Sequence, residues 1–304
     1  MSILALVFFV VPFLTLVGLV LLVAALVQRS IPAPSEAATV ARRHATWVNA
    51  AAWVTALAVA VVLGVQLLRS VWGSGLYAGV AAGLLPGFFG LVFLAVHALG
   101  ERTWPRPAGE VRRAHLAPRA TPRGPSWLRR LTWAWVGLLA TALVAAGLTS
   151  SDGRAVAISY ASNAIESTGP YPGWFYGIPL LIATVLILAA TEGVLRLIGR
   201  RPAVVDTDPD YDAASRGLSA HRALRGTQLV LALTAAGVLS VMGVALGNLS
   251  DKGLGILGGT LGGLAIVVAV VGMIATTIPG RPVRTAARPT SPGKLPAQVT
   301  DDPR

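Results

Sequence analysis

The sequence predicts an all-α, polytopic transmembrane helix bundle with about seven spans. Hydrophobic residues make up 54% of the 304 residues and charged residues only 12%, which is about half the charged fraction of a typical soluble domain. The chain also contains apolar runs long enough to cross a bilayer, which takes roughly 20 helical residues. A transmembrane β-barrel would show short alternating segments instead, so we expect helices.

The runs cover residues 3–27, 47–68, 76–99, 131–148, 177–198, 228–247 and 254–278. The first has too long an apolar stretch for a signal peptide, lacks a basic start and has no cleavage site close behind it. We therefore expect it to be retained as a helix. Residues 1–278 are predicted to form one transmembrane domain, and residues 279–304 a disordered cytoplasmic tail.

Basic residues predict the orientation, because lysine and arginine are retained on the cytoplasmic side of a membrane. Alternate segments, namely 28–46, 100–130, 199–227 and the tail from 279, hold 21 of the 25 lysines and arginines. The opposite segments hold only Arg69, Arg154 and Lys252. We expect the N-terminus outside, the C-terminus inside, and an outer loop over 149–174 that ends in an interfacial aromatic belt. The scarcity of lysine beside arginine is typical of a GC-rich bacterial genome and indicates a plasma membrane.

The cytoplasmic loop at 100–130 carries eight arginines against two glutamates. Topology and contact with anionic lipids account for them, since each basic residue near an anionic surface contributes about 1 kcal/mol; a protein partner is the alternative. A nucleic-acid partner is not expected, because five prolines oppose a groove-reading helix. Trp104 and Trp127 are expected as interfacial anchors. The candidate lipid or partner contacts are Arg102, Arg106, Arg112, Arg113, Arg119, Arg123, Arg129 and Arg130.

The same loop carries a resemblance. Its sequence GERTWPRPAGEVRRAHLAPR, over residues 100–119, is followed by Pro-Ser-Trp before the fourth run. It resembles a pattern in uncharacterised actinobacterial multi-pass membrane proteins. The resemblance covers this loop and loosely the helix layout, and it implies no assigned activity, substrate or catalytic residue.

Ionisable residues are nearly absent from the central parts of the runs, although such residues usually indicate ion or substrate paths. The fifth run offers Glu192 and Arg196, which are four apart and share one helical face. They form either a buried functional pair beside a cavity or an interfacial pair among headgroups. We favour the interfacial pair, because Arg200 and Arg201 follow directly.

Small residues predict close helix packing in the third and seventh runs. We expect these faces to pack within the bundle; self-association through one face, and a discontinuous helix as in some transporters, are the alternatives. The candidate packing residues are Gly79, Gly83, Gly87, Gly255, Gly258, Gly259, Gly262 and Gly263.

Alternate aspartates at 206–212 lack the glycine and glutamate of an EF-hand loop. We expect a cytoplasmic turn whose last aspartate, Asp212, caps a short interfacial helix over 212–226. Arg216, Arg222 and Arg225 then lie towards its end, as the helix dipole prefers. Weak binding of a divalent ion is the alternative.

No catalytic residue, cofactor or metal site is predicted. The four histidines His44, His97, His115 and His221 lie on separate segments without metal-binding spacing. We find no phosphate loop or serine nucleophile motif, and the chain has no cysteine. Enzymatic activity is therefore unsupported.

Three functions remain open. The first is an accessory or scaffold membrane component whose basic loops and glycine faces serve lipids, a membrane-protein partner or a second copy of the chain. The second is a transporter or permease component for a neutral or apolar solute. The third is a membrane enzyme with dispersed polar residues. A polar cavity near Glu192 between the third, fifth and seventh helices would favour transport over a scaffold.

Overall fold

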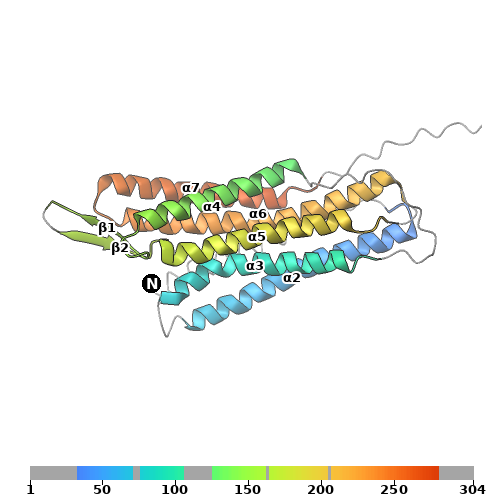
Figure 1. The fold of residues 1–304 in the computed structure, drawn as a ribbon, viewed down its shortest axis with the longest axis horizontal. Coiled ribbons are helices and arrows are strands. Elements are labelled where there is room, and N and C mark those ends of the chain that lie inside the picture. The colour runs from blue at the N-terminus through green and yellow to red at the C-terminus, as the bar shows by residue number, and fades with distance from the viewer. Residues whose placement is uncertain (1–32, 71–75, 106–124, 162–163, 205–206, 281–304) are drawn as a thin grey trace, which may run out of the picture.

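The computed structural model describes residues 33–70, 76–105, 125–161, 164–204 and 207–280. Within these residues, six long helices run side by side and a small β-hairpin lies at one end (Figure 1). The helices are α2 (Glu36–Ser70), α3 (Leu76–Arg102), α4 (Ser126–Thr149), α5 (Trp174–Arg200), α6 (Pro209–Gly247) and α7 (Lys252–Thr277).

Each of the six helices is long and apolar enough to cross a membrane. The chain is therefore an all-helical, membrane-embedded protein, as its hydropathy predicts. The predicted first span, residues 3–27, and the tail from 281 lie outside the described residues. Six of the seven predicted spans thus correspond to observed helices.

Helix α6 forms the centre of the bundle. It contacts α3, α4, α5 and α7 and is buried along most of its length. Figure 1 shows α2 and α3 on one side of the bundle and α4 and α7 on the other, with α5 and α6 between them. The apolar core includes Phe89 and Phe93 of α3, Leu143 of α4 and Leu231 of α6, all almost fully buried. The long exposed rows of Val, Ile and Leu on α7 are those that lipid would cover.

Two helices begin earlier than their apolar runs suggest. Helix α2 starts at Glu36, where the Ser35 hydroxyl accepts a hydrogen bond from the Ala38 amide. Helix α6 starts at Pro209 behind the N-cap residue Asp208 and continues without interruption to Gly247. The predicted short helix over 212–226 is therefore wrong as a separate element, because it is the first part of α6. Much of the predicted loops 28–46 and 199–227 is helical for the same reason.

The glycines of α3 lie against α5. A Cβ atom at Gly79 would be 3.0 Å from Tyr176 Cε1, and one at Gly83 would be 3.5 Å from Leu180 Cδ2. Gly87 similarly lies against Ala183 of α5, at 3.4 Å. Small residues on this face thus let the two helices approach closely.

The glycines of α7 divide into two faces. A Cβ atom at Gly258 would be 2.6 Å from both Gly243 O and Gly247 N, so the backbones of α6 and α7 touch there. Gly262 lies on this face as well, because a Cβ atom at Gly243 would come within 3.0 Å of its amide nitrogen. The second set points into open space along α7 and consists of Gly255, Gly259 and Gly263.

The predicted outer loop over 149–174 contains a hairpin of β1 (Val156–Ser159) and β2 (Ile165–Thr168). The strands are antiparallel, with Val156 opposite Thr168. Its anchor is the Glu166 carboxylate, which accepts hydrogen bonds from the Tyr160 hydroxyl and from Ser250 between α6 and α7. These bonds hold the pKa of Glu166 below its ordinary value of 4.5, and the bond from the Tyr160 hydroxyl has the largest effect.

Candidate functional site

Basic residues gather at the end of the bundle opposite the hairpin. Of the described lysines and arginines, Arg69, Arg154 and Lys252 lie at the hairpin end, where α2 ends and α7 begins. The others lie towards the opposite end, where α2, α4 and α6 begin and α3, α5 and α7 end. We call this opposite end the basic end.

Several charged residues at the basic end are buried inside the bundle. On α6, only 4 to 6% of the surface is exposed at each of Arg216, Arg222 and Arg225. Their predicted position on a separate interfacial helix is wrong, because continuous α6 carries them between its neighbours. Arg201, just after α5, is buried as well. We call Arg201, Arg216, Arg222 and Arg225 the arginine cluster.

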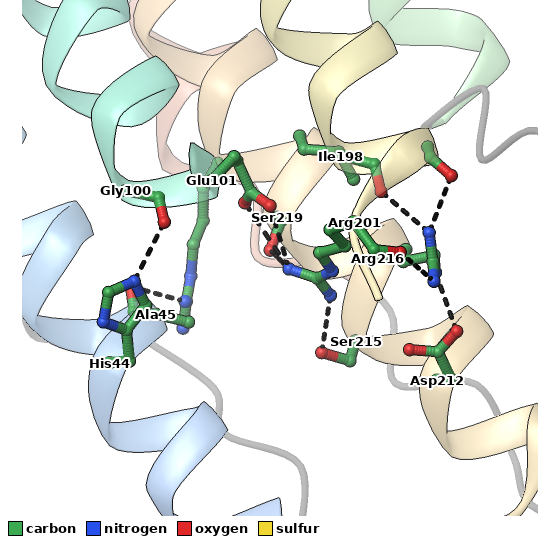
Figure 2. Close-up of polar contacts among 12 residues, drawn as sticks. His44, Ala45, Gly100, Glu101, Ile198, Arg201, Asp212, Ser215, Arg216 and Ser219 are labelled. Atoms are coloured by element: carbon green, nitrogen blue, oxygen red, sulfur yellow. Dashed lines mark hydrogen bonds and ion pairs between the residues drawn. The ribbon is translucent and has the colours of Figure 1, made fainter. Parts of the chain in front are cut away.

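Arg201 forms the most enclosed ion pair (Figure 2). Its Nη1 lies 3.3 Å from Glu101 Oε2, and the two side chains are 0% and 6% exposed. The guanidinium also donates to Ser215 Oγ and Ser219 Oγ, at 2.9 and 3.1 Å. Its other face covers the Trp104 ring, with 3.7 Å from Cζ to the ring centroid. Burial lowers the pKa of Arg201, and the Glu101 charge opposes that shift.

Arg216 closes the end of α5. Its Nε donates to Asp212 Oδ2 at 2.7 Å, and its Nη1 donates to the carbonyls of Ile198 and Gly199 at 2.9 and 2.8 Å. Its Nη2 donates to the Arg201 carbonyl at 2.9 Å. A cation here satisfies carbonyl groups that a helix C-terminus leaves unpaired. Asp212 thus serves as the partner of Arg216 and is not the helix cap that the sequence suggested.

Arg222 and Arg225 have no carboxylate partner among the described residues. Arg222 Nη1 donates to the Ala45 carbonyl at 3.2 Å, and Arg225 Nε donates to the Thr276 carbonyl. The buried atoms Arg222 Nε and Arg225 Nη2 have no hydrogen-bond partner in the described part of the chain. Among the described residues, these two buried cations donate their hydrogen bonds to backbone carbonyls.

A small recess of about 10 Å³ lies beside Arg222. Its size corresponds to about one water-sized atom. Figure 2 shows two of its walls, with the His44 ring bonded to the Gly100 carbonyl at 2.9 Å and Glu101 turned towards Arg201. The lining residues are His44, Ala45, Val48, His97, Gly100, Glu101, Trp104, Ser219 and Arg222.

Further along α6, Gln228 links α6 to α4 deep in the bundle. Its Nε2 donates to the Leu128 carbonyl at 3.0 Å and to Thr132 Oγ1 at 2.6 Å. Its Oε1 accepts from Trp135 Nε1 at 2.9 Å. The neighbouring hydroxyls of Thr191 and Thr227 lie 3.0 Å apart and join α5 to α6. Both N–H groups of the Gln228 amide donate and its oxygen accepts one hydrogen bond, so this network holds α4 and α6 together.

The sequence-predicted pair Glu192 and Arg196 does not come together. Glu192 pairs instead with Arg129 of α4, at 3.0 Å, and both side chains are partly exposed. In the described helix α5, Arg196 lies exposed one turn further along and forms no ion pair with Glu192. The correction arises because a neighbouring helix offers Glu192 a closer cation than its own helix does.

The candidate contact arginines of the 100–130 loop are only partly described. Arg102 and Arg130 are exposed at the basic end, and Arg129 holds Glu192. The remaining five lie outside the described residues, namely Arg106, Arg112, Arg113, Arg119 and Arg123. Of the two tryptophans predicted as interfacial anchors, Trp127 is 41% exposed. Trp104 is buried beneath Arg201, so its assignment as an anchor is wrong.

Two of the histidines, His44 and His97, line the same recess, although they lie on different helices. His221 contacts the Ile278 carbonyl at 2.9 Å, and His115 lies outside the described residues. Within the described ranges, no group of three metal-binding side chains could hold an ion. The three described histidines thus lie in the polar region around the arginine cluster.

Sequence reasoning missed the arginine cluster, although one signal was present. Arg216, Ser219, Arg222 and Arg225 follow each other at a spacing of three, which places them along one side of a helix. If the predicted helix over 212–226 is extended into the apolar run that starts at 228, this row of polar residues is expected to face the inside of the bundle. The partners on α2, α3 and the segment after α5 could not be found from local spacing.

Comparison with protein-family models, with curated proteins and with solved structures finds no match to this chain. The resemblance of the 100–119 loop to actinobacterial membrane proteins stays a prediction. The geometry of the arginine cluster is accordingly the basis for a functional proposal.

Proposed function

We propose that this chain is an accessory or scaffold component of a bacterial plasma membrane. In this proposal the basic end faces the cytoplasm, the hairpin end faces outward, and the exposed arginines of the basic end bind anionic lipids and a membrane-protein partner. A second copy of the chain is the alternative partner.

The observation that carries the proposal is the contrast between the two parts of the bundle. The basic end holds an ordered cluster of four arginines, two of them joined to Glu101 and Asp212. Exposed arginines such as Arg102 and Arg130 surround it. Retention of arginine on the cytoplasmic side supports the proposed orientation. A rigid and positively charged end can bind anionic surfaces such as that of a membrane.

The transport alternative has less support. The apolar stretches 47–68, 76–99, 131–148, 228–247 and 254–278 carry no aspartate, glutamate, lysine or arginine, and 177–198 carries only Glu192 and Arg196. Glu192 pairs with Arg129 of α4, and α7 packs against α6 rather than facing α3 and α5 around Glu192. A polar cavity between α3, α5 and α7 was the feature expected of a transporter. The observed packing favours a scaffold.

Copurification from native membranes tests the proposal. We would compare the unaltered chain with a variant carrying Arg102→Gln, Arg130→Gln and Arg200→Gln, all exposed at the basic end. A matched control removes three positive charges of the hairpin end through Arg69→Gln, Arg154→Gln and Lys252→Gln.

The expected result is that the same anionic lipids and partner copurify with the unaltered chain and the control, and are lost from the basic-end variant. Equal retention by all three chains would contradict the proposal. Saturable uptake of a neutral solute by liposomes containing the purified chain would favour the transport alternative. Reporters fused after Arg304 and near Gly153 test the orientation, and we expect a cytoplasmic and an external signal respectively.

A further inference from the structure

The arginine cluster carries more positive charge than its neighbours neutralise. Two carboxylates, Glu101 and Asp212, are each bound to one arginine of the cluster. Arg222 and Arg225 receive only backbone carbonyls from the described residues. Because an uncompensated buried charge is costly, a surplus of this kind within a membrane helix indicates a role beyond packing.

Arg222 lines the recess and has a guanidinium nitrogen without a partner among the described residues. One guanidinium nitrogen, Nη1, is held by the Ala45 carbonyl, while Nε has no partner among the described residues. The residue is 6% exposed, so water cannot freely satisfy that N–H. An Arg N–H that is buried, charged and unpaired is a strong donor for an anionic oxygen.

His97 lines the same recess and also has a nitrogen without a partner among the described residues. His97 is 4% exposed, and its Nε2 has no partner in the described part of the chain. The Phe93 ring lies 4.6 Å from the imidazole, centroid to centroid, and fixes its position. In the tautomer protonated at Nε2, His97 is a donor.

Ser219 supplies a third donor to the recess. Its Oγ accepts a hydrogen bond from Arg201, so its own hydroxyl proton remains to be donated. Glu101 also lines the recess, but its carboxylate is neutralised by Arg201 at 3.3 Å. The recess is thus lined by one cation without an ion-pair partner among the described residues, and Arg222, His97 and Ser219 can each donate a hydrogen bond to an oxyanion.

We propose that the recess binds one oxygen of a phosphate-type oxyanion, with Arg222 supplying the charge and His97 and Ser219 the further hydrogen bonds. The volume of about 10 Å³ admits a single oxygen atom and leaves the rest of the group outside. A lipid headgroup and free phosphate share this chemistry. This inference extends the proposed contact with anionic lipids. It depends on the proposed function only in that a membrane lipid would then be the source of the anion.

Thermal unfolding of the purified full chain in lipid nanodiscs tests the site. One arm compares discs of phosphatidylcholine with discs containing phosphatidylglycerol. The other arm adds inorganic phosphate to phosphatidylcholine discs. The test variant is Arg222→Gln, and the matched control is Arg130→Gln, which removes an exposed arginine at the same end.

We expect one of the two anions to raise the midpoint of unfolding of the unaltered chain and of Arg130→Gln. In Arg222→Gln its apparent dissociation constant should rise by at least about tenfold, as for the loss of a hydrogen bond to a charged group. Stabilisation by phosphatidylglycerol alone identifies a headgroup. Stabilisation by inorganic phosphate identifies a free anion.

Arg222→Lys and Ser219→Ala provide the second measurement, because both make smaller changes than Arg222→Gln. Each should weaken binding severalfold while the chain remains folded. The proposal is overturned if neither anion stabilises the unaltered chain, if Arg130→Gln weakens binding as much as Arg222→Gln, or if both milder variants bind normally. This assay requires neither a partner protein nor a particular membrane orientation. A negative result therefore counts against the anion site alone and leaves the scaffold proposal to be tested separately.

Discussion

Substitution of Gly258 by alanine should separate α6 from α7. The added Cβ atom would lie 2.6 Å from Gly243 O and from Gly247 N, whereas ordinary contacts begin at 3.4 Å. Both neighbours are backbone atoms, which cannot rotate away as a side chain could, so the helices must move apart by up to about 0.8 Å. A gap of that size loses about a quarter to a half of the van der Waals attraction of each contact. We expect a loss of about 1–3 kcal/mol, as for other overpacked sites.

Gly259→Ala is the matched control, since a Cβ atom at Gly259 meets nothing within 4 Å. Both substitutions gain the same helix propensity, up to about 1 kcal/mol, so the difference between them isolates the contact with α6. Unfolding in mixed detergent micelles with rising dodecyl sulfate measures that difference. Equal stability of the two variants would refute the close approach at Gly258. Gly259→Leu, measured by crosslinking, separately tests self-association through the open face of α7.

Three further changes test the polar contacts. Glu101→Gln leaves Arg201 buried without its countercharge, and thermal unfolding should show a loss of about 3–5 kcal/mol. Gln228→Leu leaves the Trp135 indole N–H without its acceptor, which should cost about 1–3 kcal/mol in the same measurement. The pKa of Glu166 is depressed, so hairpin docking should be complete above pH 4.5 and be lost as the pH falls through the depressed value. Spin-label distances between the hairpin and the turn joining α6 to α7 measure this release.

Each of these changes has a control. Glu36→Gln removes an exposed carboxylate, and Gln66→Leu alters an exposed glutamine of α2. Both should change stability by no more than about 0.5 kcal/mol. In Glu166→Gln the hairpin distance should no longer depend on pH. A loss in Glu36→Gln as large as in Glu101→Gln would contradict the importance of the buried ion pair.

The apolar spans were predictable because a helix in lipid must be apolar over a fixed length. The first part of α6 was not, because polar residues such as Arg216, Ser219 and Arg222 are buried there. Several of their polar groups bond to partners far away in the chain, such as Arg222 to the Ala45 carbonyl. The hairpin escaped prediction as well, since each strand has only four residues.

The candidate site was less predictable than the fold. Arg201 and Trp104 come from different loops, and only the packing of α3 against α5 and α6 brings them to 3.7 Å. The sequence predicted Arg196, one turn away, as the partner of Glu192, whereas Arg129 on α4 forms the ion pair with Glu192. Local spacing thus identifies which residues share a helix face, and tertiary packing decides which of them meet.

Cysteine labelling in intact cells tests the central claim, the membrane orientation of the basic end, most directly. The chain has no native cysteine, so single substitutions report one position each. Ser151→Cys lies near the hairpin and Thr103→Cys lies at the basic end, and both sites are exposed. A membrane-impermeant maleimide should label Ser151→Cys in intact cells and Thr103→Cys only after the membrane is permeabilised. Labelling of Thr103→Cys alone in intact cells would contradict the account.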